Sequence, residues 1–242
     1  MHEILLVVVG FVVAFIGTMS GGGAGLIALF TLLSFGMPIN QAIATNKLGD
    51  MGFFFPALRN LSKAKQVKKK ALPPIILINI AGGAIGTFAI AKLDTDMLSK
   101  LVAIILILII ISSIVHKGYA TKERRAKPYW PLVYFGTTMS SGAVGAGTGI
   151  LNTMVLMNLR GFTALQAMAN SFYASLFGWT ISLGILLFTD LINYRLAFFL
   201  FIGNLVGAHF GSKIAIKRGN GFVRIMTILL ALGVATRLLL FR

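Results

Sequence analysis

Cysteine is absent from the 242 residues of this chain, which excludes disulfide bonds and metal sites built on thiolates. Catalytic patterns are absent as well. The segment GAGTG at 145–149 lacks the lysine of a phosphate-binding loop, and His2-Glu3 has no second histidine for a zinc motif. The first residues contain neither a basic region nor a small-residue cleavage site, so no removed signal peptide is expected. We therefore expect a chain that is not an enzyme and that needs no cofactor or metal ion.

Charge is scarce and hydrophobic sequence is abundant. Only 12% of the residues are charged, whereas 57% are hydrophobic, and the mean hydropathy is +0.89. Four apolar runs, at 71–91, 98–115, 198–216 and 223–240, approach or reach the roughly 20 residues with which a helix spans a bilayer. This pattern predicts an all-α integral membrane protein.

The net charge of +16 would suggest a nucleic-acid partner in a soluble protein, but the positions of the basic residues indicate otherwise. They cluster in three short connections, at 59–70, 117–127 and 213–224. Basic residues in short loops at helix ends are typical of the cytoplasmic side of a membrane. We therefore expect no nucleic-acid binding. We expect a multi-pass protein of the cell membrane, with these clusters inside and both termini outside.

Glycine clusters interrupt two of the apolar segments. The first cluster, at 20–25 (SGGGAG), divides the segment 4–35, and the second, at 141–149 (SGAVGAGTG), divides the segment 129–159. The charge pattern brings both ends of each segment to one side, so each is predicted to be a hairpin. An arm of about 14 residues is roughly 21 Å long, short of the ~30 Å hydrocarbon core. We expect two broken helices whose bends are buried in protein or line a cavity near mid-membrane.

Internal repetition accompanies these hairpins. Three short patterns recur at an offset of 124 or 125 residues, in the same order in both halves of the chain. They are Gly-x-Gly at 23–25 and 147–149, Gln-Ala-x-Ala at 41–44 and 166–169, and Asn-x-x-Gly at 79–82 and 204–207. Three matches in register indicate an internal duplication.

The charge pattern gives the two copies opposite orientations. We therefore predict two inverted repeats, at 1–116 and 129–242, joined by a cytoplasmic basic linker at 117–128. Each repeat is expected to contain a broken-helix hairpin followed by three transmembrane helices. With each hairpin counted as two arms, this amounts to ten short-to-full helices. Inverted repeats with breaks at corresponding positions are typical of secondary transporters and mark their binding sites.

The order of these motifs resembles a known family. The glycine-rich first hairpin is followed by Ala-x-Ala-Thr-Asn at 42–46, which is echoed by Ala-x-Ala-Asn-Ser at 167–171. Together with the basic linker, this order resembles the sulfite exporter TauE/SafE family along the whole chain. The resemblance implies a plasma-membrane transporter for sulfite, organosulfonates or related small anions and sulfur compounds. Lys47 and Asp50 depart from the pattern, because we expect mainly apolar and small residues there.

The residues at the helix breaks suit an anion. The second arm of each hairpin begins near the bend, and a helix N-terminus presents free N–H donors and about half a positive charge. Neutral side chains on the following helices would add donors. The expected substrate-binding residues are Gly22, Gly23, Gly25, Thr45, Asn46, Gly147, Thr148, Gly149, Asn170 and Ser171. The alternative for the glycines is close helix packing, which is the favoured reading for Asn79, Asn204 and the glycines that follow them.

Two charged residues lie inside a predicted span. Lys47 and Asp50 stand three residues apart and can pair on one helix face. Intramembrane charges mark pathways or relays, so Lys47 could attract the anion while Asp50 carries a coupled proton. A structural ion pair is the equal alternative.

These expectations combine into one functional prediction. The chain is predicted to be a secondary transporter that moves a small anion by alternating access around a midplane site. An anion channel built on the same hairpins is the alternative. The expected partners are the solute, the lipid bilayer and a coupling proton, and assembly into a homo-oligomer is left open.

Overall fold

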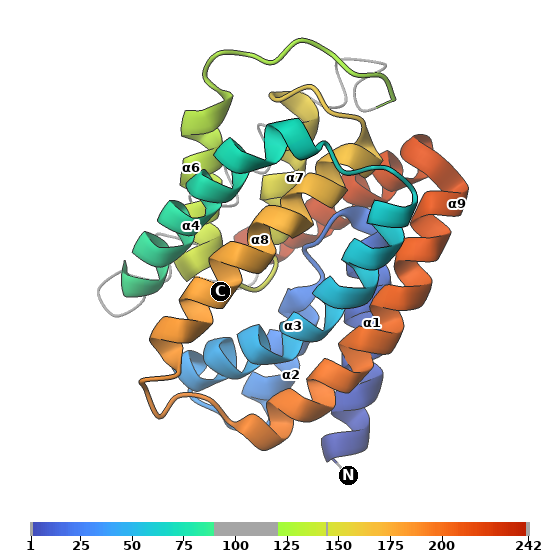
Figure 1. The fold of residues 1–242 in the computed structure, drawn as a ribbon. Helices are drawn as coiled ribbons and strands as arrows, with labels where there is room; N and C mark the ends of the chain where they lie inside the picture. The colour runs from blue at the N-terminus through green and yellow to red at the C-terminus, as the bar shows by residue number, and fades with distance from the viewer. Residues whose placement is uncertain (1, 90–120, 144, 241–242) are drawn as a thin grey trace.

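The computed structural model describes residues 2–89, 121–143 and 145–240, and this part of the chain is helical, without strands. The helices run in the order shown in Figure 1. They are α1 (His2–Ser20), α2 (Gly25–Ser34), α3 (Ile39–Lys63), the short 3-10 helix η1 (Lys69–Ala71), α4 (Leu72–Ala89), α6 (Trp130–Ala143), α7 (Gly149–Asn158), α8 (Ala164–Leu186) and α9 (Tyr194–Leu240). Within these residues, three helices are long and apolar enough to cross a membrane, namely α1, α9 and the helix formed by η1 with α4. The predicted all-α membrane class is confirmed.

The predicted spans can be compared with these helices. The run at 71–91 corresponds to α4, and the runs at 198–216 and 223–240 both fall in α9. Gly219 separates those two runs, because its φ of 79° and ψ of −172° interrupt the helix. The run at 98–115 and the start of the linker at 117 lie outside the described residues.

Both predicted helix breaks are present. α1 ends at Ser20 and α2 begins at Gly25, while α6 ends at Ala143 and α7 begins at Gly149. The second arms have 10 residues each and α6 has 14, but α1 has 19, so the expectation of a short first arm is wrong there. In Figure 1 the first hairpin opens toward the end that carries the N-terminus, and the second opens toward the opposite end.

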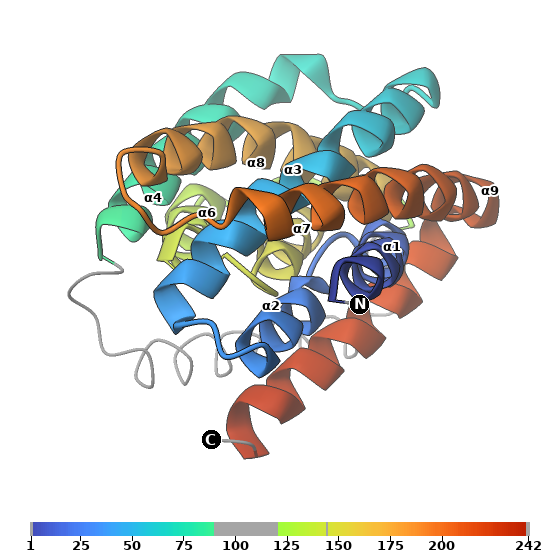
Figure 2. The ribbon, with the colours of Figure 1, turned by 90° about the horizontal axis from the view of Figure 1, so that it is seen from below.

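Close helix pairs surround the hairpins. α9 packs along α1 and α3, and α4 packs along α6 and α8; Figure 2 shows α1 beside α9 when the molecule is seen from below. A Cβ atom at Gly207 would overlap the carbonyl oxygen of Phe11, and one at Gly86 would overlap that of Met139. Glycines therefore permit these backbones to touch, which agrees with the packing reading for the segments after Asn79 and Asn204.

Candidate transport site

The bends of the two broken helices meet inside the protein. A Cβ atom at Gly22 would lie 3.0 Å from the carbonyl carbon of Gly149, and one at Gly25 would lie 3.5 Å from the Cα atom of Ala146. The Thr153 hydroxyl donates a hydrogen bond of 2.6 Å to the carbonyl oxygen of Gly21, which ties α7 to the first bend. The N-termini of α2 and α7 are consequently brought together from the two ends of the molecule.

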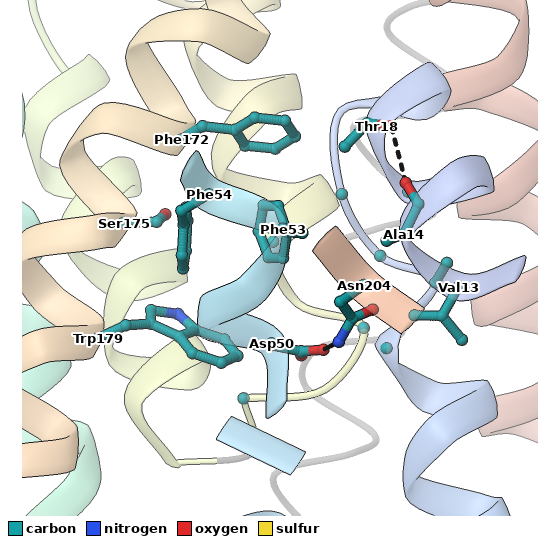
Figure 3. A pocket seen from close by; sticks show the side chains of 18 of the residues that line it. Val13, Ala14, Thr18, Asp50, Phe53, Phe54, Phe172, Ser175, Trp179 and Asn204 are labelled. Atoms are coloured by element: carbon teal, nitrogen blue, oxygen red, sulfur yellow. Dashed lines mark hydrogen bonds between the residues drawn. The ribbon is translucent and has the colours of Figure 1, made fainter. Parts of the chain in front are cut away.

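A buried cavity lies where the bends meet (Figure 3). Its volume is about 60 Å³, which holds a few water molecules or a solute of similar size. Residues from α1, α2, α3, α7, α8, α9 and both bends line it. They are Val13, Ala14, Gly17, Thr18, Gly22, Gly23, Ala24, Gly25, Asp50, Phe53, Phe54, Gly145, Gly147, Gly149, Ser171, Phe172, Ser175, Trp179 and Asn204.

Asp50 is the ionisable group of this lining. Its carboxylate accepts a hydrogen bond of 3.1 Å from the Asn204 Nδ2 and one of 3.2 Å from the Asn46 Nδ2. A Cβ atom on Gly25 would lie 3.3 Å from the Asp50 Oδ2, so the carboxylate is close to the N-terminus of α2. An ionised carboxylate in this position competes with any anion for the same helix dipole.

Some polar atoms near the cavity lack a partner. The Ser171 hydroxyl is 1% exposed, lines the cavity and has no hydrogen-bond partner within the described chain. The Oδ1 atoms of Asn46 and Asn204 are equally without a partner there, because both amide groups turn their nitrogen toward Asp50. A buried polar group that stays unpaired costs about 1–3 kcal/mol. These atoms therefore favour a polar ligand in the cavity.

Aromatic side chains form the wall opposite α1. Phe53 and Phe54 from α3 face Phe172 and Trp179 from α8 (Figure 3). The Phe53 and Phe172 rings are edge to face at 5.3 Å, as are those of Phe54 and Trp179 at 5.9 Å. Apolar walls with a few convergent polar groups are typical of small-molecule sites.

The structure brings seven of the predicted site residues to this cavity, namely Gly22, Gly23, Gly25, Asp50, Gly147, Gly149 and Ser171. Thr148 lies at the second bend, where its hydroxyl bonds to the carbonyl oxygen of Gly145. Asn46 reaches the site through its hydrogen bond to Asp50, whereas Thr45 and Asn170 lie outside the lining.

Thr45 and Asn170 accept hydrogen bonds from the backbone of the other half of the sequence. The Thr45 hydroxyl accepts from the Asn193 amide N–H at 3.0 Å, and the Asn170 Oδ1 accepts from the Lys68 amide N–H at 3.2 Å. Each bond joins the helix after one hairpin to a connection in the opposite half. The two acceptor oxygens are engaged in this way and both residues lie outside the lining, so Ser171 is the predicted neutral polar side chain that lines the cavity.

Lys47 and Asp50 do not form the expected ion pair. The Lys47 ammonium donates a hydrogen bond of 2.6 Å to the carbonyl oxygen of Gly142, close to the C-terminal end of α6, and lies 5.9 Å from the Trp179 ring centre. The ion pairs of the described chain are Lys68 with Glu123 and Arg195 with Glu3. The structural-pair alternative is therefore wrong. Lys47 instead compensates the negative end of the α6 dipole.

Sequence reasoning missed Asn204 and the aromatic wall. The glycines that follow Asn204 favour a packing role for it, as they do for Asn79 at the corresponding position of the first repeat. The two asparagines have different partners, since the Asn79 Nδ2 donates to the Tyr134 hydroxyl at 3.2 Å. Asp50 in the other half of the chain could have pointed to Asn204, because a buried carboxylate needs hydrogen-bond donors and an amide supplies one.

A membrane protein in which two broken helices meet at a buried cavity, lined by apolar side chains and a few polar groups, has the construction of a secondary transporter. The family model of the sulfite exporter TauE/SafE matches residues 6–238, and the chain belongs to this family. It is a membrane transporter, which agrees with the expectation that it is not an enzyme.

Curated relatives match along nearly the full length. A probable membrane transporter protein of Haemophilus influenzae is 27% identical over 233 residues, covering 94% of this chain and 90% of the relative. The probable membrane transporter protein ORF9 of Sinorhizobium sp is 28% identical, with 97% and 91% covered. The probable membrane transporter protein YfcA of Escherichia coli K12 is 25% identical, with 97% and 88% covered. No solved structure matches this chain significantly.

Proposed function

We propose that this transporter moves a small anion by alternating access, and that the cavity between the two helix breaks is its binding site. The observation that carries the proposal is the buried Ser171 hydroxyl, which has no partner among the described residues, at the place where the N-termini of α2 and α7 meet. Helix N-termini supply N–H donors and positive potential for an anion, and the hydroxyl supplies one more donor. Glycine at the bends gives a solute access to the backbone.

The substrate is a sulfur-containing anion, such as sulfite or an organosulfonate. The family is described as a sulfite exporter, which supports a sulfur oxyanion. The aromatic wall favours an anion with an apolar portion, because such a portion can lie against Phe53, Phe172 and Trp179 while the charged head faces the bends. A small organosulfonate fits this pattern better than sulfate does.

Asp50 carries the coupling proton. The acid is buried beside the anion site, and its hydrogen bonds come from Asn46 and Asn204 rather than from a cation. Lys47 is held at Gly142, α1 has Glu3 paired with Arg195, and Tyr173 of α8 is bonded to Ser62. α2 carries no ionisable side chain, and His209 of α9 lies outside the lining described above. Only Asp50 among these groups therefore faces the cavity.

Flux measurements test the proposed substrate. In proteoliposomes that contain the purified chain, we expect uptake or release of small sulfonates and sulfite to exceed that of sulfate. We also expect an imposed proton gradient to drive accumulation above the equilibrium level. Flux that merely follows the anion gradient, at every proton gradient applied, would assign the protein to the alternative anion channel.

The proposed topology places both termini outside the cell and the basic connections inside. The chain has no cysteine, so single cysteines can be introduced without a background signal. An impermeant thiol reagent applied to intact cells should label a cysteine added at the N-terminus and should leave Lys65→Cys and Arg124→Cys unlabelled until the membrane is opened. Labelling of Lys65→Cys from outside would reverse the proposed orientation.

A further inference from the structure

A second cavity lies among the basic connections. Its volume is about 700 Å³, and none of its described lining residues belongs to the transport cavity. Six basic side chains from three separate segments surround it, namely Lys65, Lys68, Lys69, Lys70, Arg124 and Arg160. The positive-inside rule explains why basic residues gather at one end of a membrane protein. It does not explain why they converge on one hollow, which we call the basic cleft.

Backbone contacts give the basic cleft a fixed shape. The Arg124 amide N–H donates to the Gly161 carbonyl oxygen at 2.8 Å, and the Lys127 amide N–H donates to that of Leu159 at 2.9 Å. Gly161 has a φ of 84°, and a Cβ atom there would overlap the carbonyl oxygen of Arg124. The connection before α6 is therefore held against the connection after α7.

Basic side chains outnumber acidic ones in the described lining of the basic cleft. The Arg160 guanidinium lies 5.0 Å from the Phe162 ring centre and 5.6 Å from that of Trp130, so stacking orients it. Glu123 is the acidic residue of the lining. Hydrogen bonds from Lys68 and Gln166 hold the pKa of Glu123 below its ordinary value, so it stays ionised at neutral pH and offsets one positive charge. The remaining surplus fits a ligand with phosphate groups.

Helices with exposed apolar side chains begin at the edge of the basic cleft. Lys69 and Lys70 lie in η1, which runs directly into α4, where Leu77 and Phe88 are each 67% exposed. The Trp130 ring that stacks on Arg160 begins α6, where Leu132 is 75% exposed. α4 and α6 pack against each other. A phosphate in the cleft would thus have two apolar helices beside it for acyl chains.

We propose that the basic cleft is a binding site for the headgroup of an anionic phospholipid, whose acyl chains lie along α4 and α6. The combination of converging cations with exposed apolar helices favours a membrane lipid over a soluble phosphate. The site is separate from the transport cavity, and the proposal does not rest on the transported solute.

Lipid retention by the purified chain tests this site. Native mass spectrometry of the protein in detergent should show tighter binding of phosphatidylglycerol than of phosphatidylcholine. The variant Lys69→Gln/Lys70→Gln should lose about fivefold in affinity for phosphatidylglycerol per lysine, about 30-fold together. The matched control is Lys213→Gln/Lys217→Gln, which removes the same charge from α9 outside the described cleft lining and should retain the lipid.

Three results would overturn the assignment. The first is equal retention of the two lipids by the unchanged protein, and the second is an equal loss in the control variant. The third is displacement of phosphatidylglycerol by millimolar glycerol phosphate, which would identify a soluble-phosphate site instead. Should the lysine variant fail to fold, a salt titration of lipid binding to the unchanged protein tests the proposal instead. The preference for phosphatidylglycerol must fall as ionic strength rises, and a preference independent of salt would contradict the proposal.

Discussion

Asparagine at position 50 should abolish proton-driven accumulation of the anion while the anion still binds. The amide keeps the shape of the carboxylate but cannot exchange a proton. It is also accommodated locally, because the Asn46 amide can turn over and offer the new N–H₂ group its Oδ1 atom, which lacks a partner within the described residues. We therefore expect Asp50→Asn to fold and to fail in coupled transport, as measured by gradient-driven uptake into proteoliposomes.

The same role of Asp50 predicts the direction in which anion affinity changes with pH. An ionised Asp50 beside the N-terminus of α2 repels an anion, whereas the protonated acid does not. Proton and anion should therefore bind together, and anion affinity should rise as pH falls, by up to about tenfold per pH unit for one linked proton. In Asp50→Asn the affinity should be independent of pH. Such linkage would make the two ions move in the same direction.

Lys47 supplies the control for this experiment. Since Lys47 bonds to Gly142 rather than to Asp50, adding Lys47→Met to Asp50→Asn should restore nothing and should lower stability through the unsatisfied end of α6. Recovery of coupled transport in the double variant would mean that the two charges depend on each other, and it would remove Asp50 as the proton carrier.

A methyl group at Gly25 should reduce flux by roughly tenfold or more, because one added carbon in a fitted site costs about that much. The backbone of Gly25 is helical, and a Cβ atom added there would lie 3.3 Å from the Asp50 Oδ2.

Valine at Gly23 or Gly147 should abolish flux entirely. There the φ angles are 95° and 80°, and the Cβ atoms would lie 2.9 Å from the Ile150 Cβ and 2.5 Å from the Leu26 Cγ. Those two variants are expected to lose stability as well.

The control for Gly25→Ala is Gly136→Ala, since a Cβ atom at Gly136 meets no neighbouring atom of the described chain within 4 Å. Initial flux rates should be normalised to the amount of folded transporter, measured by gel filtration. Full flux in a well-folded Gly25→Ala variant would assign the glycines of the bends to helix packing alone.

The helical membrane class and the two helix breaks could be predicted because they depend on local composition. The glycines at 20–25 and 141–149 end their helices independently of tertiary contacts, so both breaks could be predicted. The partners of side chains were not predictable in this way. Lys47 and Asp50 are neighbours on a helix, but tertiary packing places Gly142 of α6 beside one and Asn204 of α9 beside the other. Thr45 and Asn170 were predicted to be donors to a solute, but they lie outside the cavity lining and accept hydrogen bonds from backbone amides more than 100 residues away.

The tight helix pairs have a consequence for motion. α9 touches α1 backbone to backbone, and α4 touches α6 in the same way, so each pair combines one helix from each half of the sequence. A rigid-body movement that kept these contacts would carry α1 with α9 and α4 with α6. Each moving body would then contain helices from both halves of the sequence. The boundary between the bodies would therefore not coincide with the basic linker that divides the sequence.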